Sequence, residues 1–231
     1  MMQPYSYFIT GTDTDVGKTY VASALVRHFA KMQLKTIGMK PVAAGCELIN
    51  GDLLNEDVTQ LMQASNVNAP LALVNPYVFV PAIAPHIASK LVGITISLNV
   101  IVNAFEKLTQ LADVVIVEGA GGFCVPLNTS ETTADLAVKL NLPVILVVGM
   151  RLGCINHALL TVQAIQARGL TVAGWVANQV TGEMPMYQDN FDTLKQLIDA
   201  PCLAEVKWKQ AVTFNGYLQP QFANSPFNKE L

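Results

Sequence analysis

Residues 11–19 are Gly11-Thr12-Asp13-Thr14-Asp15-Val16-Gly17-Lys18-Thr19, which fits the pattern G-x-x-x-x-G-K-[ST]. They directly follow the short apolar run Tyr7-Phe8-Ile9-Thr10. A glycine-rich turn between a buried strand and a helix aims backbone N–H groups and the positive end of the helix at one point, where a triphosphate can bind. We therefore predict a P-loop, in which Lys18 contacts the outer phosphates and Thr19 offers its hydroxyl to magnesium.

The sequence after Lys18 supplies the context that a P-loop requires. Apolar residues recur at helical spacing, with polar ones between them: Val21, Ala22, Leu25, Val26 and Phe29. A short motif can also arise by chance in an ordinary strand-to-helix turn. The strand-like run before the motif and the amphipathic helix after it favour the P-loop over that alternative.

Composition limits the class of protein. The chain has 231 residues, of which 52% are hydrophobic and 13% charged, so we expect one α/β domain with a large core. The net charge of −3 and the scattered basic residues leave no basic stripe, which argues against nucleic acid as a partner. The high apolar content is compatible with an oligomer and equally with buried parallel strands.

Cysteine usage and apolar runs bear on the compartment. The four cysteines, Cys46, Cys124, Cys154 and Cys202, form no C-x-x-C pair, so we expect reduced thiols and neither a zinc site nor a disulfide framework. No apolar run reaches the roughly 18 residues of a membrane span, and the first residues lack a basic start followed by an apolar core. We expect a soluble cytoplasmic protein that does not associate with a membrane.

Apolar runs alternate with helical patterns along the chain. Strands are predicted at 5–10, 36–40, 114–117, 144–148 and 172–177, and helices at 16–32, 98–111, 133–140, 155–168 and 186–198. This alternation predicts a single P-loop α/β domain over residues 1–231, with a mostly parallel central sheet and helices on both faces. Residues 43–54 and 75–85 are expected to be irregular and outside the sheet. Residues 208–231 are expected to form a loosely packed C-terminal cover.

Polar residues end three of the predicted strands. Lys40, Glu118 and Asn178 each close an apolar run, and ligands bind beyond the carboxyl ends of the strands in open parallel sheets. Lys40 could neutralise charge on a substrate carboxylate, carbamate or phosphate, or be an ordinary surface lysine. Glu118, followed by Gly119-Ala120-Gly121-Gly122, could hold magnesium or be a solvated strand end. Asp57 could be a second metal ligand or a carboxylate favoured by a helix dipole, and local sequence does not separate the two.

Another helix start follows the strand predicted at 144–148. Residues 153–156, Gly153-Cys154-Ile155-Asn156, would present free N–H groups that could bind an anion. Every helix start shares this property, so local sequence favours a structural role.

An ordered set of blocks resembles the dethiobiotin synthetase family, from the N-terminus to about Trp208. The blocks are residues 11–19, Lys40-Pro41-Val42, Asn75-Pro76-Tyr77, Pro85-His86, 118–122, 152–157 and Gly174-Trp175-Val176-Ala177-Asn178. The resemblance implies a homodimeric ligase that joins CO2 to 7,8-diaminopelargonate with ATP and Mg2+, giving dethiobiotin, ADP and phosphate. It also implies that the reaction passes through a carbamate and a carbamic-phosphoric anhydride.

The resemblance also implies roles for matching residues. Lys18 and Lys40 would be catalytic, and Thr19, Asp57 and Glu118 would hold magnesium. The nucleotide would contact Asp15, Val16, Gly17, Lys18, Thr19, Tyr20, Asp57, Glu118, Gly119, Ala120, Gly121, Asn178, Gln179, Lys207 and Trp208, with Asn178 recognising adenine. The amine substrate would contact Thr12, Lys40 and Ala44. Its distal carboxylate would be received by Gly153, Cys154, Ile155 and Asn156 of the partner subunit.

Three residues depart from the family pattern. Ala44 stands where a hydroxyl residue is often found, and Asp15 stands where a longer glutamate is common. Lys207 precedes Trp208 where proline is frequent. We predict reduced nucleotide selectivity, or a shifted loop, around Lys207.

Three other classes of protein are alternatives to a dethiobiotin synthetase. Partitioning ATPases usually carry a lysine just after the first P-loop glycine, where this chain has Thr12, and no basic amphipathic C-terminal helix is evident. The amidotransferase synthetases of cobalamin assembly need a glutaminase domain, for which this chain is too short. A non-catalytic nucleotide sensor is a further alternative, because Ala44 and Lys207 depart from the pattern.

Overall fold

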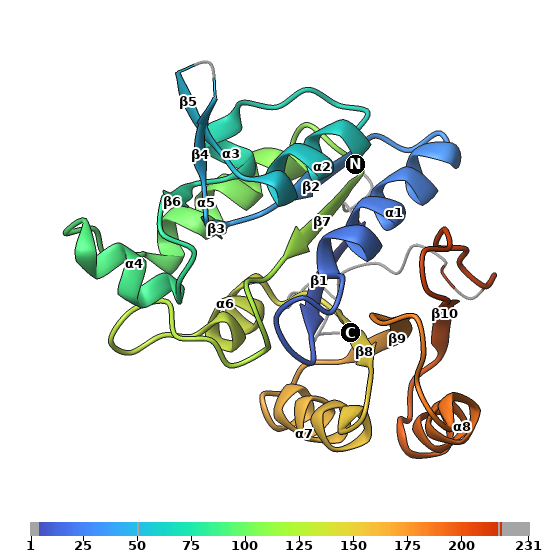
Figure 1. Ribbon diagram of the computed structural model, residues 1–231. Coiled ribbons are helices and arrows are strands. Elements are labelled where there is room, and N and C mark those ends of the chain that lie inside the picture. The colour runs from blue at the N-terminus through green and yellow to red at the C-terminus, as the bar shows by residue number, and fades with distance from the viewer. Residues whose placement is uncertain (1–4, 50, 217, 219–231) are drawn as a thin grey trace, which may run out of the picture.

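The computed structural model describes residues 5–49, 51–216 and 218 (Figure 1). Its centre is a parallel sheet with the strand order β10-β9-β8-β1-β7-β2. The strands are β1 (Tyr5–Gly11), β2 (Thr36–Met39), β7 (Val114–Glu118), β8 (Val144–Met150), β9 (Val172–Gln179) and β10 (Cys202–Val206). Because all six run the same way, their carboxyl ends meet at one edge of the sheet.

Helices cover both faces of this sheet. The helices that the structure describes are α1 (Lys18–Lys31), α2 (Glu56–Ala64), α3 (Leu71–Val74), α4 (Pro85–Leu91), α5 (Leu98–Thr109), α6 (Thr133–Leu140), α7 (Cys154–Ala167) and α8 (Tyr187–Leu197). Alternate residues of β1 enter different cores: Tyr7 and Ile9 pack with α1, whereas Phe8 packs with α5 and α6. Such two-sided burial explains the continuous apolar runs. The predicted parallel sheet with helices on both faces is confirmed.

The segment between β2 and β7 builds a side structure instead of adding to the sheet. It contains β3 (Val42–Ala44), β4 (Glu47–Ile49), β5 (Asp52–Leu54) and β6 (Tyr77–Phe79). Strand β3 pairs with β6 in parallel, and β4 pairs with β5 in an antiparallel hairpin. The prediction that residues 43–54 and 75–85 lie outside the central sheet is confirmed, but their expected irregularity is wrong. Strands of three residues are too short to show a period in the sequence.

One predicted boundary shifts for a clear physical reason, and one strand was not predicted. The first helix was predicted from residue 16 but begins at Lys18, because Asp15 and Gly17 have positive φ values of 57° and 85° that an α-helix excludes. The edge strand β10 was not predicted.

The C-terminal segment packs on the sheet where it is described. Val212 and Phe214 lie against the core formed by α1, and the Asn215 backbone N–H donates to Leu203 O at 2.8 Å. Residues 217 and 219–231 of the predicted C-terminal cover lie outside the described residues. Among the helices that the structure describes, none is long and apolar enough to cross a membrane.

The start of α6 offers a test of how sequence fixes a helix end. Thr132 forms a capping box with Asp135, accepting from its backbone N–H and donating its own N–H to the Asp135 carboxylate at 2.7 Å. We expect Thr132→Ala to lower the free energy of unfolding by about 1 kcal/mol, because alanine lacks the hydroxyl that accepts from the otherwise free Asp135 N–H. Urea unfolding measures this. Ser97→Ala is the matched control, since the N-cap Ser97 of α5 makes no side-chain cap bond. An equal loss in both variants would contradict the capping argument.

Candidate active site

The loop of residues 11–19 joins the carboxyl end of β1 to the start of α1. Thr12 ties the loop to β8, with its backbone N–H donating to Val147 O at 3.0 Å and its hydroxyl accepting from Gly149 N at 3.2 Å. Gly17 adopts a positive φ, and a Cβ there would lie 2.2 Å from Asn178 Nδ2. That amide donates to Val16 O at 2.8 Å and holds the loop from the end of β9. The loop is therefore held by two strands, β8 and β9, in addition to β1, from which it continues.

Lys18 is the first residue of α1 and points back over the loop. Its Nζ donates to Asp13 O at 2.9 Å. Burial, together with the nearby charge of Lys40, lowers the pKa of Lys18 to about 8 despite the neighbouring carboxylates. An anion bound beside Lys18 would favour its charged form.

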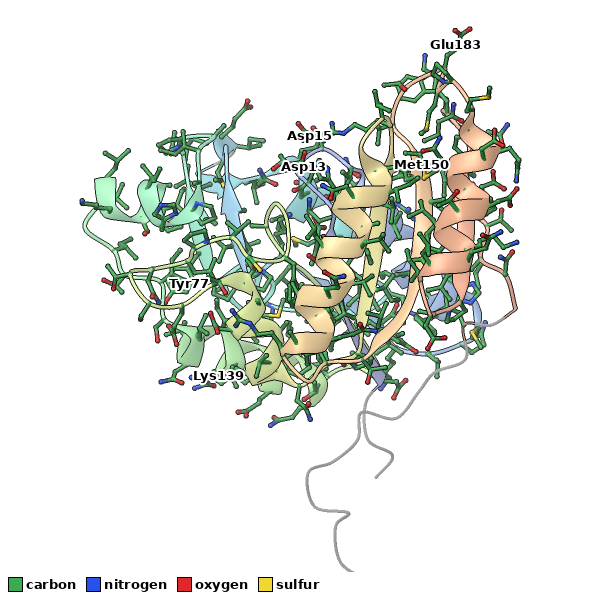
Figure 2. All side chains as sticks on the ribbon, turned by 90° about the horizontal axis from the view of Figure 1, so that it is seen from below. Asp13, Asp15, Tyr77, Lys139, Met150 and Glu183 are labelled. Carbon is green, nitrogen blue, oxygen red and sulfur yellow. The ribbon has the colours of Figure 1, made fainter. Side chains whose placement is uncertain are left out.

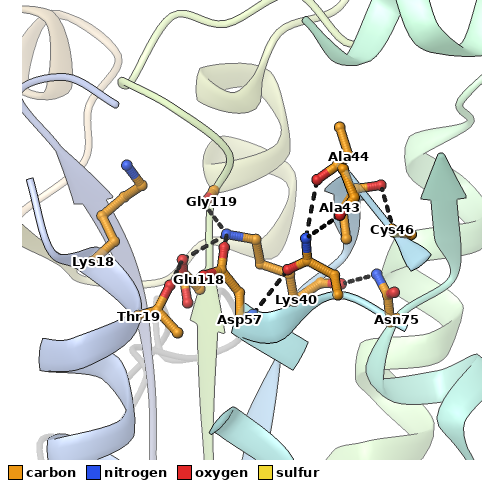
Figure 3. A network of polar contacts seen from close by, with 12 residues as sticks. Lys18, Thr19, Lys40, Ala43, Ala44, Cys46, Asp57, Asn75, Glu118 and Gly119 are labelled. Atoms are coloured by element: carbon orange, nitrogen blue, oxygen red, sulfur yellow. Dashed lines mark hydrogen bonds and ion pairs between the residues drawn. The ribbon is translucent and has the colours of Figure 1, made fainter. Parts of the chain in front are cut away.

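Lys40 forms the centre of a network of polar contacts (Figure 3). Its Nζ donates to Glu118 Oε1 at 2.6 Å, forms an ion pair with Asp57 Oδ2 at 2.9 Å, and lies 3.4 Å from Gly119 O. Lys40 is 5% exposed and Glu118 is 1% exposed. Burial alone would lower the pKa of Lys40, but Glu118 and Asp57 outweigh it and raise the pKa. Burial would raise the pKa of Asp57, but Lys40 lowers it.

The backbone of Lys40 is held as firmly as its side chain. The Lys40 N–H donates to Val74 O at 2.9 Å, and the buried Asn75 amide donates to Lys40 O at 2.6 Å. Sequence reasoning did not assign this role to Asn75, although Asn75-Pro76 was among the family blocks. The signal available in the sequence was an asparagine directly before Pro76, a position at which helices usually end.

Thr19 and Glu118 offer further oxygen atoms at the same point. The Thr19 hydroxyl donates to Glu118 Oε1 at 2.8 Å. Glu118 Oε2 is buried and has no hydrogen-bond partner among the described residues. A buried carboxylate oxygen without a donor is costly unless a cation approaches it. Together with Asp57, these hard oxygen ligands suit Mg2+, which takes few protein ligands and keeps water or phosphate on its other positions.

A cavity of about 610 Å³ opens beside this network. Lys40, Asp57 and Ala44 line one part of it, and Asp15, Ala120 and Gly121 line another. The Ala44 carbonyl accepts from Asn55 Nδ2 at 3.0 Å. The Ala44 side chain is a methyl group and offers no hydrogen bond. The predicted convergence of Lys18, Lys40 and the acidic residues at one rim of the sheet is confirmed.

A second group of residues gathers at the ends of β9 and β10. Gln179 accepts from the Trp208 N–H at 3.3 Å, and the Tyr20 hydroxyl donates to Gln210 O at 2.9 Å. Lys207 points elsewhere: its ammonium lies 3.8 Å from the centre of the Tyr187 ring and pairs with Glu205. Gln179 and Trp208 therefore lie together, and Tyr20 contacts the same C-terminal segment through Gln210, whereas the Lys207 side chain is tied to α8.

Residues 153–156 start α7, just after the carboxyl end of β8. Gly153 has a φ of 93° and Cys154 is buried, while Leu152 before them is 95% exposed. Arg151 forms an ion pair with Asp13 of the loop, a link that the sequence did not reveal. Figure 2 shows Asp13, Asp15 and Met150 along the same edge of the molecule, with Tyr77 and Lys139 away from it. Residues 153–156 do not line the cavity beside Lys40 in this single chain.

Comparisons with known proteins match almost the whole chain. A family model described as an AAA domain covers residues 5–215. The ATP-dependent dethiobiotin synthetase BioD of Aromatoleum aromaticum is 53% identical over 206 residues, which is 89% of this chain and 92% of that protein. The protein of the same name from Nitrosospira multiformis is 52% identical over 204 residues, 88% of each chain.

Solved structures share the fold at low sequence identity. The GDP complex of the signal recognition particle receptor FtsY from Elizabethkingia anophelis aligns with a TM-score of 0.52 and 15% identity, over 94% of this chain and 62% of the receptor chain. The MinC:MinD cell division protein complex of Aquifex aeolicus gives 0.54 and 16%, over 88% and 81%. These similarities concern the fold alone and support the P-loop architecture.

Proposed function

This chain belongs to the ATP-dependent dethiobiotin synthetases, and from that premise we propose that it carboxylates 7,8-diaminopelargonate with CO2 and closes the cyclic urea. The products are dethiobiotin, ADP and phosphate. One observation carries the proposal: Lys18, Lys40, Glu118 and Asp57 converge at the mouth of the P-loop, beside a cavity of about 610 Å³. This arrangement offers cationic groups to a phosphoryl group and to a substrate carbamate at the same time.

The proposed reaction forms two C–N bonds in sequence. One amine of the substrate takes up CO2 and loses a proton, giving a carbamate. A carbamate oxygen attacks the γ-phosphorus of ATP, and ADP leaves. The neighbouring amine then attacks the carbonyl carbon of the resulting carbamic-phosphoric anhydride and expels phosphate. Lys40 and Lys18 stabilise the charge that gathers on the carbamate and the transferring phosphoryl group, where positioning and charge neutralisation supply most of the catalysis.

Thr19, Asp57 and Glu118 would hold Mg2+ in this proposal. The orphaned Glu118 Oε2 and the neighbouring oxygen donors fit a hard cation. The metal would neutralise charge on the phosphate oxygens. The chain itself aligns the phosphates through the backbone of residues 15–20 and 119–121, and shields the reacting atoms with the cavity walls.

The remaining contacts follow the family. We assign adenine recognition to Asn178, with Gln179, Trp208 and Lys207 at its side, and the amine substrate to Thr12, Lys40 and Ala44. Residues 153–156 of a second subunit would receive the distal carboxylate, so we propose a homodimer with the substrate site at its interface. The exposed Leu152 beside Gly153 supports a contact there. We place the enzyme in the cytoplasm, to which its four free cysteine thiols are suited.

The test of the proposed function is a turnover assay. We expect ADP release that requires both 7,8-diaminopelargonate and bicarbonate. ATP hydrolysis that ignores both compounds, and instead responds to a protein or lipid, would support the partitioning ATPases. Nucleotide binding without any turnover would support a nucleotide sensor.

Lys207 leads to a prediction about nucleotide selectivity. Because its side chain is tied to Tyr187 and Glu205, it does not close the wall beside Gln179 and Trp208. We expect CTP and GTP to support turnover within about tenfold of ATP, a range that weak pocket contacts allow. Comparing kcat/KM for the three nucleotides measures this. Lys207→Pro should raise the preference for ATP, and strict ATP preference in the unsubstituted enzyme would reject the prediction.

A further inference from the structure

The Lys40 ammonium contacts both carboxylates that would hold a divalent cation. Its Nζ lies 2.6 Å from Glu118 Oε1 and 2.9 Å from Asp57 Oδ2. Thr19, the third oxygen donor, contacts the same Glu118 Oε1 at 2.8 Å. One lysine therefore engages both carboxylates of the group that suits Mg2+ (Figure 3).

These contacts stabilise two neighbouring acids in a buried place. Glu118 is almost fully buried, and an uncompensated buried carboxylate is strongly destabilising. Lys40 supplies a positive charge that both acids share. The ammonium is thus a structural counter-ion as well as a candidate catalytic group.

The Lys40 ammonium cannot hold the two acids and contact a substrate anion in the cavity at the same time. To neutralise a carbamate or a phosphoryl group, the ammonium must turn toward the cavity that Lys40 also lines. Its backbone is fixed by Val74 and Asn75, so this change has to come from the side chain alone. A lysine stem of four methylene groups permits such a movement without a change of fold.

We propose that Lys40 and a divalent cation compete for the carboxylates of Asp57 and Glu118, so that cation binding releases the Lys40 side chain into the cavity. The inference rests on the proposed function, because it takes Thr19, Asp57 and Glu118 as the metal ligands. It adds an order of events: the catalytic lysine becomes available only when the metal has arrived. This coupling would keep the substrate side of the cavity inactive until the metal is bound.

The proposed competition predicts how much Lys40 lowers the affinity for a cation. If the ammonium holds the carboxylates in nine of ten molecules or more, the apparent affinity for a cation falls by about tenfold or more. Lys40→Met keeps the length of the side chain and removes its charge. We therefore expect the Lys40→Met protein, free of nucleotide, to bind Mn2+ at least about tenfold more tightly than the unsubstituted protein.

Mn2+ titration followed by electron paramagnetic resonance measures the free ion directly and needs no turnover. Lys139→Met is the control, because Lys139 is an exposed lysine of α6 that donates to Asn99 at 2.6 Å and contacts neither acid. Its affinity for Mn2+ should equal that of the unsubstituted protein. Equal affinities in the Lys40→Met and unsubstituted proteins would overturn the competition.

A second substitution separates failure of the inference from failure of the proposed metal site. Adding Glu118→Gln to Lys40→Met should abolish the tight binding if the metal lies between these acids. Tight binding that survives Glu118→Gln, or no binding in any of the proteins, would overturn the metal site and the inference together. Equal binding that is lost with Glu118→Gln would overturn the inference alone.

Chemical labelling tests the same release in the unsubstituted protein, and so does not depend on the folding of a variant. The buried Lys40 amine should react slowly with acetic anhydride, and Mg2+ alone should increase its acetylation several-fold, as read by mass spectrometry. Lys90, an exposed residue of α4, is the internal control and should not change. Acetylation of Lys40 that is unaffected by saturating Mg2+ would overturn the inference.

Discussion

Replacing Lys40 by alanine is expected to lower kcat by on the order of 10³-fold, equivalent to about 4 kcal/mol of lost transition-state stabilisation. The expectation follows from the position of Lys40, which lines the cavity and whose ammonium, 2.6 Å from Glu118 in this structure, can turn toward a carbamate and a phosphoryl group bound there. Binding of metal-free ADP should change by less than about threefold, because in the proposed site Lys18 and the loop backbone hold the phosphates. Steady-state kinetics and calorimetric titration with ADP in a chelator measure the two quantities.

Lys35→Ala is the control for this substitution. Lys35 precedes the opposite end of the same strand, β2, where its backbone N–H is bonded to the Asp113 carboxylate. Loss of a lysine side chain there should leave kcat unchanged. A Lys40→Ala enzyme that turns over normally would remove Lys40 from the catalytic residues, and a matching loss in Lys35→Ala would assign the effect to general destabilisation.

The part of the site that sequence predicts is the part that chain direction and burial determine. An apolar run that ends in Lys40, Glu118 or Asn178 specifies a strand with a polar end. Parallel pairing then brings these ends to one rim, without any information on side-chain contacts. Lys18 was placed just as securely, because the loop pattern fixes where α1 begins.

What sequence did not predict depends on contacts between distant residues. The ion pair between Arg151 and Asp13 joins segments 138 positions apart, and neither residue is unusual in its local sequence. The same holds for Lys207, whose departure from the family pattern was visible but whose contacts with Tyr187 and Glu205 were not. The ion pairs of Lys40 with Glu118 and Asp57 show a further limit. They can be predicted only once the ends of β2 and β7 and the start of α2 are positioned relative to one another.

Gly17→Ala is expected to weaken ATP binding by at least about 100-fold, since a displacement of about 1 Å in a positioned site can have an effect of that size. Two separate observations support this. Gly17 has a φ of 85°, which disfavours any side chain, and a Cβ would lie 2.2 Å from Asn178 Nδ2. The Asn178 amide cannot move freely, because it donates to Val16 O at 2.8 Å and so holds the loop. The backbone N–H groups that should surround the phosphates would therefore shift with the clash.

A control separates backbone strain from distortion of the site. Gly169, at the end of α7, also has a positive φ, 74°, but a Cβ there would meet nothing within 4 Å. Gly169→Ala should lower the free energy of unfolding by about 1–2 kcal/mol through strain alone and leave ATP affinity unchanged. Calorimetric titration with ATP and urea unfolding of both variants give the comparison. ATP affinity in Gly17→Ala equal to that of the unsubstituted protein would mean that the loop tolerates a Cβ, and that contact with Asn178 does not set the position of the phosphate-binding N–H groups.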